Sequence, residues 1–396
     1  MRNINSITSD NCCGCSACND KCPVSAISMS ENAGDRMPMV DEEKCIFCGQ
    51  CLKVCPNYSV VPKSKYEKKS YVAFYKEKNV EEKSSSGGIF AALACYILGN
   101  GGIVYGASIK REDGSVVCRH IRIDKIDDLH LVQGSKYVQS LTDGIFKQVL
   151  QDLKTNKTVL FSGTSCQVAS LKRYVGDRDN LYTVDLVCHG VPKYSLFNDY
   201  IEYLQKKWHG NILNISFREK GRIYHEKILD KILSISIKNE NGMLQKKEII
   251  QPHSSFYCLF INRAGYRNSC YNCKYASPDK PADLTLGDFS PTHNEINTYS
   301  LLTNKHYSSV IVHSEHGMQL LREIKNSIFI KEIPFNEMIR HHGNLNHPSA
   351  ITEEGEHLYN IYLKGGFEKL HSYIEYENIK SNFKWQVYKY LKLLKL

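Results

Sequence analysis

Short apolar runs alternate with amphipathic stretches along the middle of the chain, between residues 70 and 290. Runs rich in β-branched and aromatic residues predict strands at residues 70–75, 158–163, 181–188, 212–217 and 283–289. Between several of these runs the apolar positions recur with a helical period, which predicts helices over residues 166–174 and 195–206. This alternation predicts a mixed α/β core domain.

Residues 84–109 carry no charge, as a membrane-spanning helix would. The segment Gly99-Asn100-Gly101-Gly102 interrupts this run and leaves about ten apolar residues before it, too few to cross a bilayer. We therefore expect a buried helix over residues 88–98, a turn, and a strand at 103–107.

Beyond residue 291 the chain is more charged, and we expect it to be mainly helical. Its last stretch, residues 384–396, has the pattern of an amphipathic basic helix, with lysines around an apolar face of Val387, Tyr390, Leu391 and Leu394. Such a helix either packs on the protein's own core, the commoner outcome, or lies on a membrane surface. Peripheral membrane contact by this helix is therefore one expectation.

Eight cysteines between positions 12 and 55 form two copies of one pattern, Cys12-x2-Cys15-x2-Cys18-x3-Cys22-Pro23 and Cys45-x2-Cys48-x2-Cys51-x3-Cys55-Pro56. This spacing is typical of bacterial-type ferredoxins, in which the fourth cysteine of each run ligates the other 4Fe–4S cluster. We therefore assign one cluster to Cys12, Cys15, Cys18 and Cys55, and the other to Cys45, Cys48, Cys51 and Cys22. Zinc and disulfides are the alternatives, but a zinc site uses four ligands in two pairs rather than eight in this spacing.

These patterns together predict three parts. A small two-cluster ferredoxin-like domain covers residues 1–62, and a charged linker at residues 62–69 follows it. The mixed α/β domain covers residues 70–290, and a mainly helical extension covers residues 291–396. A chain of 396 residues is long enough for two or three domains.

The composition indicates the environment and the partners. The apolar share of 42% is ordinary for a soluble protein, and the chain starts without the apolar segment of a signal peptide. Cysteines in metal-ligand spacing need a reducing compartment, so we expect the cytoplasm. The net charge of +9 is spread along the chain without arginine-rich arms, which argues against nucleic acid as a partner. It suits an anionic small molecule or an acidic electron carrier, and a solvated lysine-rich surface explains it about equally well.

Four further cysteines occur in polar loop or turn contexts: Cys166, Cys188, Cys270 and Cys273. The first two follow predicted strands, which places them at one edge of the sheet. In a chain with two other clusters we favour a third 4Fe–4S cluster, although zinc fits equally well by ligand count and a site without metal is also open. Cys166 at the first turn of a helix, with His189 as a base, would alternatively suit nucleophilic catalysis.

A flavin is expected because clusters carry single electrons, whereas organic substrates usually take two. The sequence has neither the dinucleotide-binding fingerprint nor a Walker loop. Two glycine-containing loops could hold it instead. The loop SSSGGIF (residues 84–90) places Ser86, Gly87 and Gly88 before a helix, and GSKY (residues 134–137) offers Ser135 and Lys136 to an anion. Ordinary turns are the alternative for both loops.

Five motifs in order carry a resemblance to a known family: SSSGGIF, GSKYVQS, FSGTSCQVASLK, VDLVCHGVP and CYNCKYASPDKPADLTLGDF. Over residues 70–291 the chain resembles the coenzyme F-420 hydrogenase/dehydrogenase beta-subunit family, with the ferredoxin part fused in front. The resemblance implies an FAD-binding α/β domain with its own 4Fe–4S cluster on the four later cysteines. It departs from the family at Ser165, where proline is usual, and at Ser290, where the family motif GDFW ends in tryptophan.

The resemblance also implies a reaction. Family members pass electrons between ferredoxin-type centres and a two-electron acceptor, which is coenzyme F-420 in archaeal hydrogenase and formate dehydrogenase subunits. Relatives reduce other organic molecules, and many bacterial relatives are associated with polysaccharide pathways. We therefore expect an iron–sulfur flavoprotein oxidoreductase that takes electrons from a reduced ferredoxin, a flavodoxin or a redox partner subunit and acts on coenzyme F-420 or another small molecule. A non-catalytic electron-transfer subunit of a larger redox complex is the alternative.

Three polar residues are candidates for the substrate side. His189 and Asp288 could deliver protons, although His189 could instead hydrogen-bond a cluster sulfur and Asp288 could cap a turn. Arg218 could bind an anionic substrate or lie at the surface.

Overall fold

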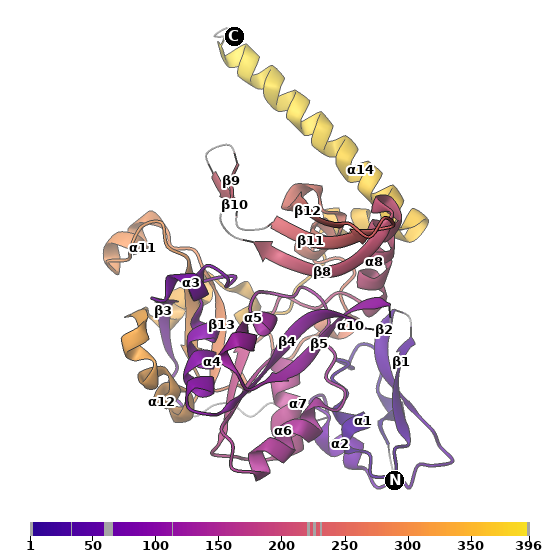
Figure 1. The fold of residues 1–396 in the computed structure, drawn as a ribbon, viewed down its shortest axis with the longest axis vertical. Helices are drawn as coiled ribbons and strands as arrows, with labels where there is room; N and C mark the ends of the chain where they lie inside the picture. The colour runs from indigo at the N-terminus through magenta and orange to yellow at the C-terminus, as the bar shows by residue number, and fades with distance from the viewer. Residues whose placement is uncertain are drawn as a thin grey trace.

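The computed structural model describes residues 3–32, 34–58, 66–112, 114–219, 222–224, 227–229 and 232–393. Its centre is an eight-stranded sheet with the order β15-β3-β14-β13-β7-β6-β4-β5 (Figure 1). The strands are β3 (Lys69–Tyr75), β4 (Ile103–Glu112), β5 (Ser115–Ile123), β6 (Val159–Ser162), β7 (Leu181–Leu186), β13 (Leu284–Phe289), β14 (Tyr307–Val312) and β15 (Ile328–Glu332). Strands β4, β6, β7 and β13 are parallel, and antiparallel strands extend the sheet on both sides.

Alternate residues of the parallel strands face two different layers of helices, as the pleat of a strand requires. Val104 and Leu160 pack in a cluster with α4, whereas Tyr105 and Phe161 pack in a cluster with α6 and α7. The helices around this sheet are α3 (Lys78–Glu81), α4 (Ile89–Gly99), α5 (Leu129–Val132), α6 (Ile145–Lys154), α7 (Ser165–Val175), α11 (His293–Thr298), α12 (Glu315–Glu323) and α13 (Phe335–Arg340). Short 3-10 helices lie at Ile4–Ser6, Ile126–Asp128, Gln251–His253, Lys325–Ser327 and Gly343–Leu345.

A second, three-stranded antiparallel sheet lies beyond β4 and β5, with the order β12-β11-β8. It contains β8 (Gly210–Glu219), β11 (Ile232–Asn239) and β12 (Leu244–Ile250), with a separate pair formed by β9 (Arg222–Tyr224) and β10 (Lys227–Leu229). Phe217, Leu233 and Phe256 share a core with helices α8 (Tyr194–Trp208), α9 (Ser255–Ile261) and α14 (Glu353–Leu393). The strand predicted at residues 212–217 therefore exists, but it belongs to this second sheet rather than to the central one.

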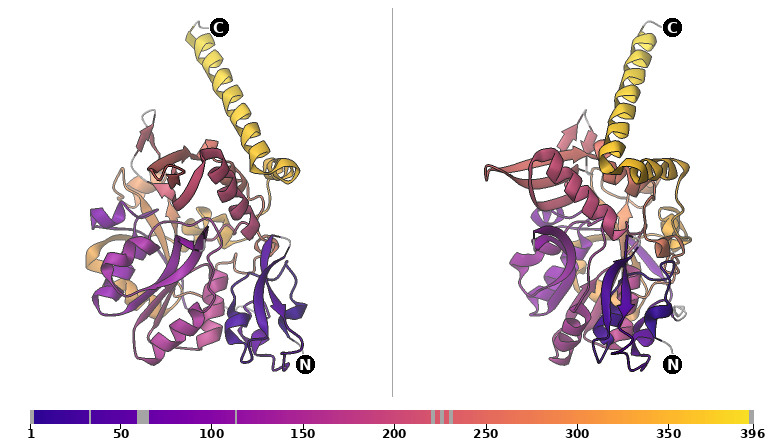
Figure 2. Two further views of the ribbon diagram at one scale, coloured as in Figure 1. Left: turned by 45° about the vertical axis from the view of Figure 1, so that its right-hand side comes forward. Right: turned by 90° about the vertical axis from the view of Figure 1, so that its right-hand side faces the viewer.

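The N-terminal unit is a pseudo-duplicated pair of short helices and one hairpin. It contains α1 (Ala17–Lys21), β1 (Ile27–Asn32), β2 (Asp35–Val40) and α2 (Gln50–Val54). A residue in the left-handed conformation precedes each helix, Ser16 at φ 59° and Gly49 at φ 70°. The unit lies beside α6 and α7 (Figure 2). Its predicted end at residue 62 and the start of the linker lie among residues 59–65, outside the described residues.

The region after residue 291 is mostly helical, but it also supplies β14 and β15 to the central sheet, and the sequence did not predict these two strands. Every residue of β14 is buried, so its sequence lacks the alternation that identifies a half-exposed strand. The chain becomes helical in α14, which is kinked at Gly365 and Gly366, and the part beyond the kink extends away from the body (Figures 1 and 2). The side chains of residues 384–396, which carry the predicted amphipathic face, lie outside the described ones.

The mixed α/β fold with a ferredoxin-like front part and a helical end is thereby confirmed. Among the described residues, none of the helices combines the length and the apolar character that a membrane crossing requires.

Candidate functional site

The first cysteine group comprises Cys12, Cys15, Cys18 and Cys55. All four side chains are buried and line one small cavity, together with the apolar side chains of Ile4, Ile7, Met29 and Pro38. Three of them come from the loop that leads into α1 and from α1 itself, and Cys55 comes from the end of α2. The structure therefore joins the fourth cysteine of the second run to the first run.

The chemistry of this group fits a metal cluster. Burial raises the pKa of the Cys12 thiol to about 11 and that of Cys55 to about 12, and the nearby charge of Cys15 adds to both increases. Four thiolates therefore persist together here only when a cationic centre accepts their charge, as iron does in a cluster.

The second cysteine group comprises Cys22, Cys45, Cys48 and Cys51. Asn3 points its side-chain amide at Cys45 Sγ, 3.7 Å away, and Cys22 Sγ accepts a hydrogen bond of 3.2 Å from the Ala26 amide. Burial raises the pKa of Cys51, with a smaller increase from Cys48. Cys48 itself is exposed. Of the three cysteine groups, this is therefore the one with a predicted ligand exposed to solvent.

The third cysteine group comprises Cys166, Cys188, Cys270 and Cys273. Cys166 lies in the first turn of α7, which a capping box between Thr164 and Gln167 fixes directly after β6. Cys188 follows β7, the parallel neighbour of β6, so both thiols lie at the carboxyl edge of the sheet.

The other two thiols reach the same place from α10 (Asn268–Tyr271) and the turn after it. Burial raises the pKa of Cys188 to about 12, and Cys166 and Cys273 add to this increase. The pKa of Cys270 is raised by burial and then by Cys188. The structure therefore brings together all four cysteines of the predicted third site.

Cys13, to which the sequence assigned no role, lies between the first and the third group. Its thiol lies within interaction distance of both Cys15 and Cys166, and these contacts raise its own pKa and lower the pKa of each partner. One side chain therefore spans the distance between a cysteine of each group. The two groups are neighbours in space although their members nearest in sequence, Cys55 and Cys166, are separated by several strands and helices of the central domain.

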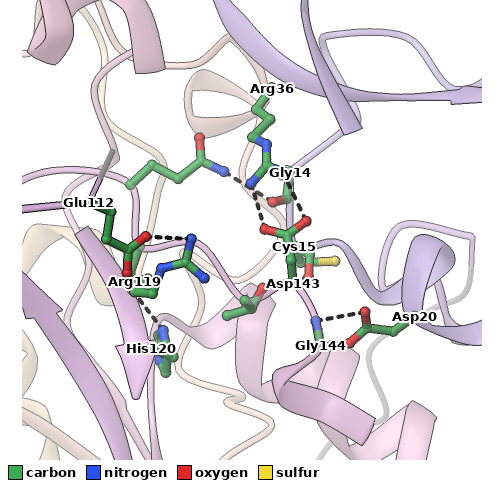
Figure 3. A network of polar contacts seen from close by, with 12 residues as sticks. Gly14, Cys15, Asp20, Arg36, Glu112, Arg119, His120, Asp143 and Gly144 are labelled. Carbon is green, nitrogen blue, oxygen red and sulfur yellow. Dashed lines mark hydrogen bonds and ion pairs between the residues drawn. The ribbon is translucent and has the colours of Figure 1, made fainter. Parts of the chain in front are cut away.

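A polar network fixes the N-terminal unit against the central domain (Figure 3). Arg36 forms a bidentate pair with Asp143, at 2.6 and 2.9 Å, and the Gly144 amide donates to Asp20 at 2.8 Å. Around the first cysteine group, the Thr142 hydroxyl donates to the Cys15 carbonyl at 2.7 Å. Ser170 of α7 donates to Cys15 Sγ at 3.0 Å, so the central domain contacts a predicted cluster ligand directly.

The two loops predicted to hold a flavin also come together. The Ser135 amide donates to Ser85 Oγ at 2.6 Å, which joins the GSKY loop to the SSSGG loop. Gly87 lies so close to β3 and β14 that a Cβ there would stand 2.5 Å from the Ala73 carbonyl oxygen. Ser86 and Lys136 each donate to a backbone carbonyl, at 2.6 Å, and burial lowers the pKa of Lys136 to about 8. Lys136 is thus held in place by the chain rather than displayed at the surface.

His189 and Asp288 lie at the ends of neighbouring strands, β7 and β13. His342 lies near both. Burial, followed by nearby His341 and His189, lowers its pKa to about 4, and Asp288 opposes this shift. Arg218 pairs with Asp288 at 2.5 Å, and its side chain is only 4% exposed, so it does not lie at the surface. The structure thus assembles a polar cluster beside Cys188, in which His342 was missed because nothing in its local sequence distinguishes it.

Comparisons with known proteins give a match in the N-terminal unit and another in the central domain. Residues 11–58 match a 4Fe-4S dicluster domain, and residues 156–337 match the C-terminal domain of the coenzyme F420 hydrogenase/dehydrogenase beta subunit. Residues 156–337 are thus similar to the coenzyme F420 hydrogenase/dehydrogenase beta-subunit family, behind a dicluster domain at residues 11–58. The match to the beta-subunit domain extends beyond the resemblance at residues 70–291 and takes in β14 and β15, in agreement with the sheet.

The curated relatives match only short stretches of this chain, of 45 to 59 residues each. Ferredoxin-2 of Chlorobaculum tepidum is 43% identical over 53 residues, which are 12% of this chain and 79% of that protein. The B component of an ion-translocating oxidoreductase complex of Methanosarcina acetivorans is 30% identical over 59 residues, or 15% of this chain and 21% of that component. The B component of the Na(+)-translocating ferredoxin:NAD(+) oxidoreductase complex of Acetobacterium woodii is 44% identical over 45 residues, or 11% and 13%. The chain thus spans about a fifth or less of the length of these two components.

Among solved structures, a chain of the F420-reducing nickel–iron hydrogenase complex from Methanosarcina barkeri is similar over 77% of this chain and 94% of its own, with 15% identity and a TM-score of 0.43.

Proposed function

We propose that this chain is an iron–sulfur flavoprotein oxidoreductase that conducts electrons from its N-terminal unit to a small-molecule acceptor held near His189 and Asp288. The contact of Cys13 with both Cys15 and Cys166 carries the proposal. It joins the N-terminal unit to the beta-subunit domain along the proposed path of the electrons. When bound, the clusters carry single electrons and the flavin exchanges them for a pair.

The three cysteine groups would hold one 4Fe–4S cluster each. Zinc also fits the third group by its number of ligands, but zinc has no redox chemistry and would end the path of the electrons beside Cys13. A cluster at the third group would instead continue that path toward the central domain. The exposed Cys48 places the second group where a partner such as a reduced ferredoxin, a flavodoxin or another subunit would deliver electrons.

The junction of the SSSGG and GSKY loops would hold the FAD. The SSSGG loop leads directly into α4, and Lys136 supplies a positive group that is fixed by its hydrogen bond to the chain. His189 and Asp288 would exchange protons with the acceptor, and Arg218 would hold Asp288 in place. Coenzyme F420 and a small molecule of a polysaccharide pathway are the two acceptors that the resemblance to this family suggests.

Anaerobic reconstitution with iron, sulfide and FAD tests the cofactors. We expect about twelve iron atoms and one FAD per chain. About eight iron atoms and no flavin would contradict the proposal, because the third group and the loop junction would then be empty.

A non-catalytic electron-transfer subunit is the competing function, since two of the relatives are components of larger complexes. The two functions separate when the reconstituted chain alone receives electrons from a reduced ferredoxin and is then offered oxidised coenzyme F420. Bleaching of the coenzyme absorbance without a partner protein supports the enzyme. Reduced cofactors that transfer nothing to any acceptor offered support the electron-transfer role.

A further inference from the structure

Arg267 is a buried cation whose backbone belongs to the third cysteine group. It immediately precedes α10, and its side chain is 2% exposed. Its amide donates to the Val191 carbonyl at 2.9 Å, and its carbonyl accepts from the Cys270 amide, also at 2.9 Å. The residue therefore ties the segment after Cys188 to the turn that carries Cys270 and Cys273.

The side chain of Arg267 crosses to the first cysteine group. Nη2 donates to the carbonyl oxygens of Cys12 and Arg36, both at 3.1 Å, and Nη1 donates to Gln139 Oε1 at 2.5 Å. The loop leaves space for it at Gly14, where a Cβ would stand 2.8 Å from Nη1. One guanidinium thus touches the loop of the first group while its main chain shapes the third.

The charge of this guanidinium is available to both groups. Its Nε is buried and makes no hydrogen bond with any atom of the described residues. Nη1 also forms an ion pair with Asp35 Oδ1 at 3.7 Å, a distance beyond that of a hydrogen bond. Nη2 contacts the backbone of Cys12 and the Arg267 carbonyl holds the backbone of Cys270, so the residue touches one predicted ligand residue of each group.

We propose that Arg267 is a positioning residue shared by the first and third cysteine groups, where its single positive charge raises the reduction potentials of both clusters together. The inference rests on the proposed function in one respect, namely that both groups hold 4Fe–4S clusters. Reduction adds negative charge to a cluster, and a cation in a dry site stabilises the more negative state, so net charge and hydrogen bonds set these potentials.

The test is a redox titration of the reconstituted full-length protein, followed by electron paramagnetic resonance. In R267Q the guanidinium is replaced by a neutral amide, and we expect both clusters to become harder to reduce. The expected change is about tenfold in each reduction equilibrium, which is ~59 mV for a one-electron couple. The second group, formed by Cys22, Cys45, Cys48 and Cys51, serves as the internal reference and should keep its potential.

Two variants control for lost packing. R267K keeps the charge but loses the planar fork of donors, so its reduction equilibria should stay within about threefold of wild type. R36Q breaks the ion pair between Arg36 and Asp143 at the same interface and leaves the Arg267 guanidinium in place, so both potentials should remain unchanged.

Each outcome of the redox titration either supports or overturns the role proposed for Arg267. Equal potentials in R267Q and wild type, a shift at one group only, or a shift in R36Q as large as in R267Q would overturn the proposal. If R267Q fails to retain iron, an iron-loaded R267K with wild-type potentials still supports it, whereas iron loss in both variants assigns Arg267 a purely structural role. Failure of the proposed function is seen separately, as missing iron in the wild-type protein.

Discussion

Substitution of Gly14 by alanine tests whether the N-terminal unit docks as described. Gly14 has φ +64°, a conformation that costs an L-residue about 1 kcal/mol or slightly more. Its added Cβ would also stand 2.5 Å from Gln139 Nε2 and 2.9 Å from the Arg36 carbonyl oxygen. These clashes, with a backbone atom of the same unit and with a side chain of the central domain, add roughly 1–3 kcal/mol, because neighbouring segments must move apart.

Gly49 provides a matched control for the backbone term. It too lies between two predicted cluster ligands, and it has φ +70°, but nothing lies within 4 Å of the position that its Cβ would take. G49A therefore carries the conformational cost alone, and we expect G14A to be less stable than G49A by about 2 kcal/mol. The difference between the two variants reports the packing around Gly14, which includes Gln139 and Arg267 of the central domain and Arg36 of the N-terminal unit.

The assay is anaerobic thermal unfolding of the reconstituted protein, followed by cluster absorbance and circular dichroism. A difference of about 2 kcal/mol corresponds to a midpoint that is lower for G14A by roughly 4–8 °C, for an unfolding unit of about 150–250 residues such as the central domain. Iron content is measured first, so that both variants are compared with full clusters. Equal midpoints for G14A and G49A would refute the docked arrangement in which the loop of the first cysteine group packs against Gln139 and Arg267.

Three further outcomes are expected. C188S should lower the iron content by about four atoms per chain. C13S should keep all of the iron, because Cys13 contacts both groups without belonging to either set of four cysteines. Iron analysis of both variants checks this. K136M should weaken FAD binding by roughly tenfold with iron unchanged, as equilibrium dialysis of the flavin would show. Burial lowers the pKa of His342 to about 4, so between pH 6.5 and 4 the unfolded chain binds a proton that the folded chain does not. The free energy of unfolding should therefore fall as the pH drops through this window, and it should fall less steeply in H342N. Urea titrations at several pH values measure it. The same slope of unfolding free energy against pH in both proteins would contradict the burial of this imidazole.

Local sequence patterns predicted those helices and strands whose own residues are enough to distinguish them. The run over residues 181–188 predicted the strand that became β7, and the uncharged segment before Gly99 predicted the buried helix α4. The spacing of the first eight cysteines carried the dicluster domain, because each motif forms within one short stretch of chain. These features depend on interactions between residues close in sequence.

The features that were missed depend on pairings between distant segments. β14 is an unbroken buried run, and only its neighbours β3 and β13 show that it is a strand of the central sheet. Cys13 has no spacing partner of its own, and its position between Cys15 and Cys166 follows from the docking of two units. Arg267 looks like any loop arginine in the sequence, since the groups that its side chain contacts come from distant parts of the chain.

The apolar cluster beneath α6 and α7 has a consequence for how this protein can be divided. Cys15, Ala17 and Val54 of the N-terminal unit are buried in the same cluster as Phe161 of β6. Truncation of the chain before β3 would therefore expose part of the interior of the remaining protein to water. A freely diffusing ferredoxin is not an interchangeable substitute for this unit unless it brings a complementary apolar surface of its own.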